Sequence, residues 1–317
     1  NGVTGLKPEH IGYENGVLGG VISALNVMCS KGDNVLLHSP TYIGFTMSLE
    51  NNGYHIVHSP LVKDENGVWR MDFEDMEKKI RENDVKLLLF CSPHNPVGRV
   101  WKREELEKVA ALCLKYHVTL VSDEIHSDIV YKGHKHQMMA SISEEIADIT
   151  VTCTAPSKTF NVAGLQLSNI IISNPKLREK FKHEVMQAGY SQPNLMGMEA
   201  CQAAYENGEE WLEELLVYLQ GNVDFVRDYL KQEIPKINLI EPEGTYLLWL
   251  DCRELGLSVE ELEHLVVDKA NLWLDPGFIF GAVGEGFERI NIACPRQTLR
   301  QAMNQLRDAL NAEAFLN

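Results

Sequence analysis

The stretch TCTAPSKTFNVAGL, residues 152–165, places one lysine among small and apolar residues. Lys158 is the only charged residue between Asp148 and Lys176. An ionised lysine is costly to keep in apolar surroundings, so its pKa falls and its neutral amine becomes a nucleophile. This is the chemistry of a lysine that forms a Schiff base with a carbonyl compound. The alternative is a loop lysine whose ammonium group reaches water past its apolar neighbours.

The segments around this stretch alternate short apolar runs with longer amphipathic ones. Apolar runs of this length are typical of strands that are buried on both faces. Residues 103–117, REELEKVAALCLKYH, have apolar residues at helical spacing and an acidic first turn, which predicts a helix. This alternation predicts an α/β protein with a mainly parallel sheet and helices on both faces. The predicted strands are residues 34–40, 86–93, 118–125, 149–156 and 167–174.

The pattern changes near residue 220, where we predict a second, smaller α/β domain. Residues 209–230 predict one or two long helices. Further strands are expected at 245–251 and 288–294, and further helices from Ser258 and from about Gln297. The predicted division is therefore a large domain over residues 1–219 and a small C-terminal domain over residues 220–317.

The composition is that of an ordinary globular protein, with 317 residues, 44% of them hydrophobic and 23% charged. A net charge of −16 argues against nucleic acid or an anionic membrane surface as a partner. No apolar run approaches the roughly 20 residues that span a bilayer, and no secretory signal is recognisable. Seven scattered cysteines without a CxxC pair predict reduced thiols, a cytoplasmic location and no metal site.

Three polar motifs each follow or end a predicted strand. They are SPHNPVG at 92–98, SDEIH at 122–126 and APSK at 155–158. Ligands in parallel α/β sheets bind beyond the carboxyl ends of the strands, so these motifs should share one edge of the sheet. The side chains expected there are Asn95, Asp123, His126, Ser157 and Lys158.

Each of these residues also has a simple structural interpretation. Asp123 could be a helix cap or a surface carboxylate. Asn95 lies in a run of turn-forming residues, and His126 could be a buried histidine whose hydrogen bonds are satisfied. The residues by themselves leave these alternatives open.

The order and spacing of the motifs resemble those of fold-type-I pyridoxal-phosphate (PLP) enzymes in the class I/II aminotransferase family. PHNPVGRVW, SDEIH and APSKTFNVAGLQ are closely similar to the MalY/PatB branch, the cystathionine β-lyase-like C–S lyases. The likeness covers essentially the whole chain and ends in FERINIACPR, residues 287–296. It implies the PLP-dependent transferase fold and pyridoxal 5′-phosphate as the cofactor.

The resemblance assigns a role to each polar residue at the sheet edge. Lys158 would hold the cofactor covalently and move the α-proton of the substrate. Asp123 would pair with the pyridine nitrogen and keep it protonated. Asn95 would donate to the phenolic oxygen of the ring, and His126 would lie near the same oxygen.

The resemblance also implies a phosphate site at the start of a helix. Residues 14–28, ENGVLGGVISALNVM, predict a glycine-rich turn that opens a helix, whose free N–H groups favour an anion. This turn is not the GxGxxG of a dinucleotide fold. Val17 and Leu18 correspond to positions that bind through their backbone, and Ser157 would add a hydroxyl group.

Gln166 bears on the choice between two branches of the family. Many aminotransferases carry a phosphate-binding arginine eight residues after the lysine, where this chain has Gln166. The lyase branch also lacks that arginine, so Gln166 favours a lyase. It also leaves the phosphate with less positive charge.

Two further residues complete the implied site. Tyr42, in SPTYIGF, corresponds to the aromatic residue that stacks on the pyridine ring, although it could be a core tyrosine. Arg289, in ERINIA, corresponds to the arginine that binds the substrate α-carboxylate through a two-pronged salt bridge. Without the resemblance, an arginine in a strand more often forms a surface ion pair.

The implied function is a PLP-dependent C–S β-lyase that converts cystathionine or a related cysteine S-conjugate to a thiol, pyruvate and ammonia. A homodimer is expected from the family. An aminotransferase on the same scaffold and a regulatory or binding protein that retains the fold are the alternatives. Family members carry roughly 80 further residues before the stretch that matches the start of this chain, so we expect the sequence to lack that segment.

Overall fold

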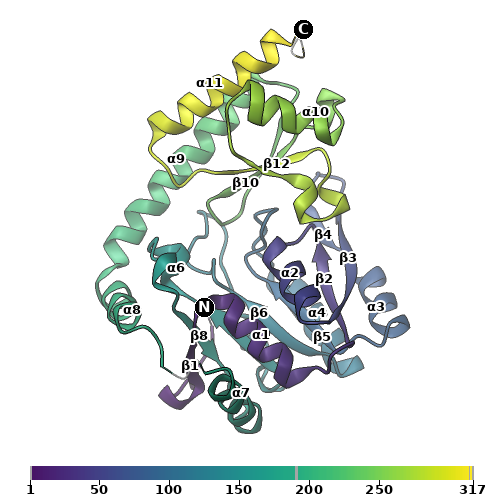
Figure 1. The fold of residues 1–317 in the computed structure, drawn as a ribbon, viewed down its shortest axis with the longest axis vertical. Coiled ribbons are helices and arrows are strands. Elements are labelled where there is room, and N and C mark those ends of the chain that lie inside the picture. The colour runs from purple at the N-terminus through teal and green to yellow at the C-terminus, as the bar shows by residue number, and fades with distance from the viewer. Residues whose placement is uncertain (1, 190–191, 314, 316–317) are drawn as a thin grey trace.

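The computed structural model describes residues 2–189, 192–313 and 315, and within them it contains two β-sheets (Figure 1). The larger sheet has eight strands in the order β1-β8-β7-β6-β5-β2-β3-β4. Its strands are β1 (Ile11–Glu14), β2 (Asn34–Ser39), β3 (His55–Lys63), β4 (Trp69–Met71), β5 (Leu87–Cys91), β6 (Thr119–Asp123), β7 (Thr150–Thr154) and β8 (Ser168–Ile171).

The five central strands of the larger sheet, β3, β2, β5, β6 and β7, are parallel. The outer pairs are antiparallel, with β8 between β7 and β1 on one side and β4 beside β3 on the other. The prediction of a mainly parallel sheet is therefore confirmed, and all five predicted strands are present. The edge strands β1 and β4, and β3 beside β4, are not predicted from the sequence.

Helices cover both faces of this sheet because both faces are apolar. Successive strand residues point to opposite faces. Leu36, Leu88 and Leu120 belong to one buried cluster, and the apolar residues next to them in the sequence belong to another. The first cluster lies under α3 (Phe73–Glu82), α4 (Arg103–Tyr116) and α5 (Glu144–Asp148), and the second under α1 (Gly16–Met28), α2 (Ile43–Asn51) and α7 (Pro175–Gln187).

The C-terminal part of the chain forms the smaller, antiparallel sheet, with strand order β11-β12-β10-β9. Most of the apolar side chains that pack around it come from residue 219 onward. Its strands are β9 (Asn238–Ile240), β10 (Leu247–Asp251), β11 (Asp275–Pro276) and β12 (Phe287–Asn291), and its helices are α9 (Glu209–Glu233), α10 (Val259–Glu263) and α11 (Arg296–Ala312).

Residues 209–230 form a single helix, α9, that runs unbroken past the predicted domain boundary at 219/220. The division into two domains stays a prediction. Ser258 caps α10 by accepting a hydrogen bond from the Glu261 N–H, and one turn of π-helix follows over His264–Lys269. The final helix begins at Arg296, one residue before its predicted start.

Shorter helices connect these elements. Among them are α6 (Pro156–Thr159), α8 (Leu195–Asn207) and 3₁₀ turns at Pro8–His10, Met139–Ser141, Ala163–Leu165, Arg253–Leu255, Gly277–Phe280 and Ala282–Gly284. In the described ranges, no helix has both the length and the apolar character needed to cross a membrane. The seven cysteines are free thiols.

The 275–286 loop joins the two sheets. The N–H of Thr41, just after β2, donates to the carbonyl oxygen of Phe280 at 2.9 Å. Within the loop, the backbones of Gly277 and Gly284 approach so closely that a Cβ on Gly277 would overlap the carbonyl oxygen of Gly284. The same Cβ would lie 2.5 Å from the carbonyl oxygen of Phe287. Because backbone cannot easily move aside, this loop requires glycine at both positions.

Gly277→Ala should therefore lower the free energy of unfolding by about 1–3 kcal/mol, the usual cost of overpacking. Urea denaturation followed by circular dichroism measures this change. The matched control is Gly164→Ala, whose Cβ would meet no atom within 4 Å. An equal loss of stability in both variants would contradict the argument.

Candidate active site

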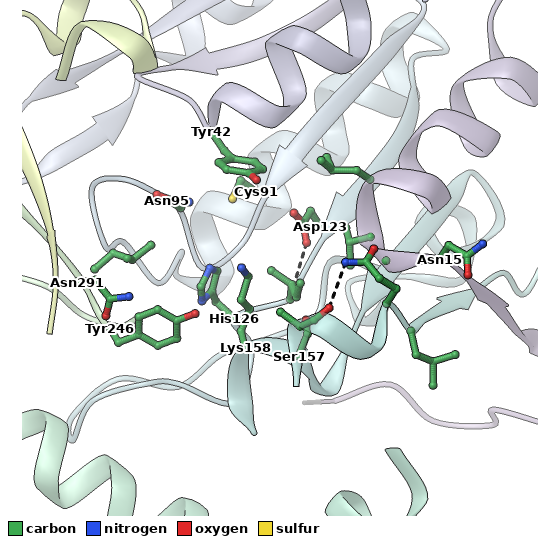
Figure 2. Close-up of a pocket in the computed structure, with 18 of the residues that line it drawn as sticks. Asn15, Tyr42, Cys91, Asn95, Asp123, His126, Ser157, Lys158, Tyr246 and Asn291 are labelled. Carbon is green, nitrogen blue, oxygen red and sulfur yellow. Dashed lines mark hydrogen bonds between the residues drawn. The ribbon is translucent and has the colours of Figure 1, made fainter. Parts of the chain in front are cut away.

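A cavity of about 370 Å³ lies where β5, β6 and β7 end and α1 begins (Figure 2). Each of the nine residues singled out from the sequence lines it, although they come from distant parts of the chain. These residues are Val17, Leu18, Tyr42, Asn95, Asp123, His126, Ser157, Lys158 and Arg289.

Asp123 is the last residue of β6 and is in register with Cys91 on β5 and Cys153 on β7. Its side chain is buried, and Oδ1 accepts one hydrogen bond, from the Ile125 N–H at 3.1 Å. Burial raises the pKa of Asp123 to about 7, against the opposing effects of that hydrogen bond and of Lys158. A positively charged ligand atom in the cavity would therefore stabilise the ionised form of this buried carboxyl group.

Lys158 lies on the short helix α6, directly after β7, and its amine points into the same cavity (Figure 2). Burial lowers the pKa of Lys158, the nearby charge of Asp123 opposes this effect, and Arg289 adds to it. The neutral form of the amine is therefore easier to reach than in an exposed lysine. This is the effect that the apolar surroundings of Lys158 in the sequence predict.

His126 is buried beside Tyr246, with their ring centroids 5.7 Å apart and an interplanar angle of 72°. Burial lowers the pKa of His126 to about 3, and the charges of Lys158 and Arg289 add to the effect, so the imidazole is neutral. Its Nδ1 is buried without a hydrogen-bond partner in the described structure. The structural alternative of a satisfied core histidine therefore does not describe this ring.

Tyr246 was not identified from the sequence, because it lies at the start of a predicted strand and no motif marks it. Burial raises the pKa of its hydroxyl group. Asn15, Cys91 and Asn291 also line the cavity and were likewise missed. Only the packing of the smaller sheet against the larger one brings Tyr246 and Asn291 to this place.

Arg289, on β12, reaches the cavity from the smaller sheet. Its Nη1 donates to Oδ1 of Asn95 at 2.7 Å. Its Nε and Nη2 both donate to Oδ2 of Asp275, at 3.1 and 2.7 Å. The guanidinium carbon lies 4.7 Å from the centre of the Phe280 ring. The Arg289 side chain is only 12% exposed, so this is not a surface ion pair of the usual kind.

The other end of the cavity is formed by the first turn of α1. The N-cap residue Asn15 makes no side-chain capping bond, so the first backbone N–H groups of the helix are left for a ligand. Gly16 begins the helix with φ of +74°, a backbone conformation that favours glycine. Ser157 and Gln166 line the cavity as well. This end offers N–H dipoles and a hydroxyl group, which suit an anion.

Tyr42 lies just before α2 and borders the cavity (Figure 2). Its ring meets Phe45 edge-on, with centroids 5.5 Å apart, and a Cβ on Gly44 would overlap the Tyr42 ring. Burial raises the pKa of the Tyr42 hydroxyl group. The ring is therefore held at the cavity wall by its neighbours, one of which must be glycine.

The family model described as "Aminotransferase class I and II" matches residues 2–306. The chain belongs to this family. It is 42% identical to cystathionine beta-lyase PatB of Bacillus subtilis (strain 168), over 96% of this chain and 79% of PatB. It is 31% identical to protein MalY of Escherichia coli (strain K12), over 98% of this chain and 78% of MalY.

Two solved structures of the same fold are similar over most of the chain. Cystalysin from Treponema denticola, described as containing a pyridoxal 5′-phosphate cofactor, has a TM-score of 0.94 and 38% identity. That match covers 97% of this chain and 78% of cystalysin. A PLP-bound putative aminotransferase from Clostridium difficile 630 also has a TM-score of 0.94, with 44% identity over 96% of this chain and 79% of its own. The family and the fold class predicted from the sequence are confirmed.

The burial of Asp123 predicts a pH-dependent effect of Asp123→Asn on the cofactor-free protein. Folded wild type keeps a proton on Asp123 up to about pH 7, whereas an unfolded aspartate releases it near the ordinary value of 3.8. Wild-type stability is therefore lost as the pH rises through this window, up to a limit of roughly 4 kcal/mol. The gain in stability of the variant over wild type should therefore be clearly larger at pH 8 than at pH 5.

Urea midpoints of both proteins at the two pH values test this prediction. Asp148→Asn, at an exposed aspartate, serves as the control and should show no such pH dependence. A gain from Asp123→Asn that is equal at both pH values, or larger at pH 5, would rule out the burial argument.

Proposed function

We propose that this chain is a PLP-dependent C–S β-lyase that cleaves cystathionine or a related cysteine S-conjugate. The products are a thiol, pyruvate and ammonia. The observation that carries the proposal is that Lys158, Asp123 and Arg289 border one cavity. The similarity to PatB and to cystalysin supports the same reaction class.

The cavity has the three kinds of group that PLP requires. The Lys158 amine, with its lowered pKa, would bond to the aldehyde carbon. The buried Asp123 carboxyl group would gain a cationic partner in the protonated pyridine nitrogen, which would offset the cost of ionising it. The first turn of α1, with Val17, Leu18 and the hydroxyl group of Ser157, would hold the phosphate. The described residues therefore fit this cofactor.

PLP, when bound, supplies an electron sink that stabilises negative charge on the substrate Cα. Asp123 would maintain that sink by keeping the ring nitrogen protonated. Asn95 would donate its amide to the phenolic oxygen, and Tyr42 would stack on the ring. His126, being neutral, adds no positive charge beside Lys158.

Lys158 and Arg289 act on the amino-acid substrate itself. Arg289 binds the α-carboxylate and so orients Cα toward Lys158. Lys158 then accepts the proton from Cα, and its lowered pKa makes the neutral amine that does so easier to form. The electron pair left at Cα expels the thiolate from Cβ. Addition of one water accounts for the products pyruvate and ammonia.

An aminotransferase is the second candidate, since a solved structure at 44% identity is described as a putative aminotransferase. The two reactions share the groups that bind the cofactor and the substrate carboxylate. Gln166 favours the lyase, because it leaves this chain without an arginine at that position. The two activities differ in their products, so they can be separated by assay.

The enzyme supplied with PLP should release thiol and pyruvate from L-cystathionine without added 2-oxo acid. Lys158→Ala should abolish this release and the visible absorption of the bound cofactor, because the described residues that line the cavity include no other lysine. Pyruvate is measured by coupled reduction and thiol by a disulfide reagent. Amino exchange that requires a 2-oxo acid, without thiol release, would support the aminotransferase instead. A wild type that remains colourless after incubation with PLP would end both proposals.

We further propose a cytoplasmic homodimer. The seven free thiols agree with a reducing compartment. The start of α8 exposes two adjacent apolar side chains, with Leu195 70% and Met196 67% exposed. Side chains of this size are rarely left uncovered together on a monomer, so this end of α8 is a candidate contact surface for a second copy.

Met196→Asp should weaken the dimer, because burying an unpaired carboxylate at an interface is unfavourable. Sedimentation velocity over a concentration series should show dissociation at least tenfold higher in concentration than for wild type. Leu114→Asp, on the exposed side of α4, is the control and should leave association unchanged. A wild type that sediments as a monomer at all concentrations would refute the dimer.

A further inference from the structure

We propose that Asp275 is a positioning residue for substrate binding. It holds Arg289 so that the two unused N–H groups of the guanidinium can bind the α-carboxylate of an amino acid. This inference rests on the proposed function, because it takes Arg289 as the carboxylate anchor. It extends that function by naming the residue that orients the anchor.

Asp275 and Arg289 face each other across two short antiparallel strands. Asp275, on β11, is the register partner of Arg289 on β12. One oxygen, Oδ2, accepts from Nε at 3.1 Å and from Nη2 at 2.7 Å. Hydrogen bonds between two charged groups are stronger than neutral ones, and two of them fix the rotation of the guanidinium plane. Asp275 therefore sets the direction in which Arg289 points.

Two other contacts hold the guanidinium from different sides. The Phe280 ring lies against it at 4.7 Å, and Oδ1 of Asn95 accepts from Nη1 at 2.7 Å. A guanidinium has five N–H groups, and Asp275 and Asn95 together use three of them. One N–H on Nη1 and one on Nη2 remain. Two donors on neighbouring nitrogens are what a two-pronged bond to a carboxylate requires.

The position of Asp275 argues that it orients Arg289 and does not occupy the substrate site. Arg289 and Asn95 line the cavity, whereas Asp275 is not among its described lining residues. The Asp275 side chain is 43% exposed, so it approaches the guanidinium from the solvent side. An internal competitor for the substrate carboxylate would have to lie inside the cavity.

The same contacts settle the orientation of the Asn95 amide. A guanidinium has no acceptor, so Asn95 can meet Nη1 only through its carbonyl oxygen. The NH₂ group of Asn95 must then face away from Arg289. Asp275 therefore orients Arg289 directly, and through Arg289 it also orients Asn95. Loss of Asp275 should disturb carboxylate binding first.

The decisive experiment compares Asp275→Asn with wild type as holoenzymes, in equilibrium binding of two ligands. L-Alanine has the α-carboxylate but no thiolate to expel, and ethylamine is the same molecule without the carboxylate. Titration followed by the visible spectrum gives both dissociation constants. We expect Asp275→Asn to weaken L-alanine binding at least about tenfold and to change ethylamine binding less than about twofold.

Three further variants keep the result interpretable. Glu285→Gln removes an exposed carboxylate from the same loop and should bind both ligands as wild type does. Asp275→Glu retains the charge and should recover most of the L-alanine affinity. Asp275→Ser gives the same comparison with a smaller side chain if the asparagine variant does not fold, as judged by thermal unfolding.

An unchanged ratio of the two dissociation constants in Asp275→Asn would overturn the proposal. A ratio that shifts in favour of L-alanine would overturn it too, and would identify Asp275 as a competitor for the substrate carboxylate. Failure of the lyase reaction is a separate result. A wild type that binds L-alanine better than ethylamine but releases no thiol from cystathionine would refute the lyase, while the binding comparison would still decide the role of Asp275.

Discussion

The site depends on one unfavourable arrangement, a buried carboxyl group and a partly buried amine at the wall of the same cavity. Burial makes Asp123 hard to ionise and Lys158 hard to protonate, so the fold supports neither charge well by itself. A ligand that carries a cationic ring nitrogen and an aldehyde relieves both constraints. The side chains of the parallel strands β5, β6 and β7 are packed on both faces of the sheet. This packing contributes the folding free energy that offsets the cost of burying the two groups.

The second constraint is the contact between the two sheets. Arg289 and Asn95 are 194 residues apart in the sequence, yet they share a 2.7 Å hydrogen bond. That bond depends on the position of the 275–286 loop. The carbonyl oxygen of Phe280 in this loop accepts a hydrogen bond from the Thr41 N–H, and the backbones of Gly277 and Gly284 lie close together. The two ends of the cavity are therefore held differently. The end at α1 is built within the larger sheet layer, and the end at Arg289 exists only where the two sheets meet (Figure 1).

The central strands could be predicted because burial on both faces produces continuous apolar runs such as LLLF in β5. The edge strands β1 and β4, and β3 beside β4, lacked that signal. β3 is exposed along much of its length, and β4 has only three residues. The direction of β8 was also hidden from the sequence, because an apolar run carries no information about whether its neighbour is parallel or antiparallel. Pairing direction follows from how the chain returns to the sheet.

The sequence by itself determined which polar motifs meet at the cavity, since each motif follows or ends a buried strand and strand ends converge at one edge of a parallel sheet. Nothing in the sequence pointed to Tyr246 beside His126, or to Asp275 and Phe280 around Arg289. These neighbours lie on the smaller sheet or in the segments next to its strands, and the position of that sheet relative to the larger one is set by packing between distant segments. Local sequence determines whether a segment forms a strand or a helix. Contacts between residues of the two sheets depend on how the two hydrophobic cores pack against each other, which only the folded chain decides.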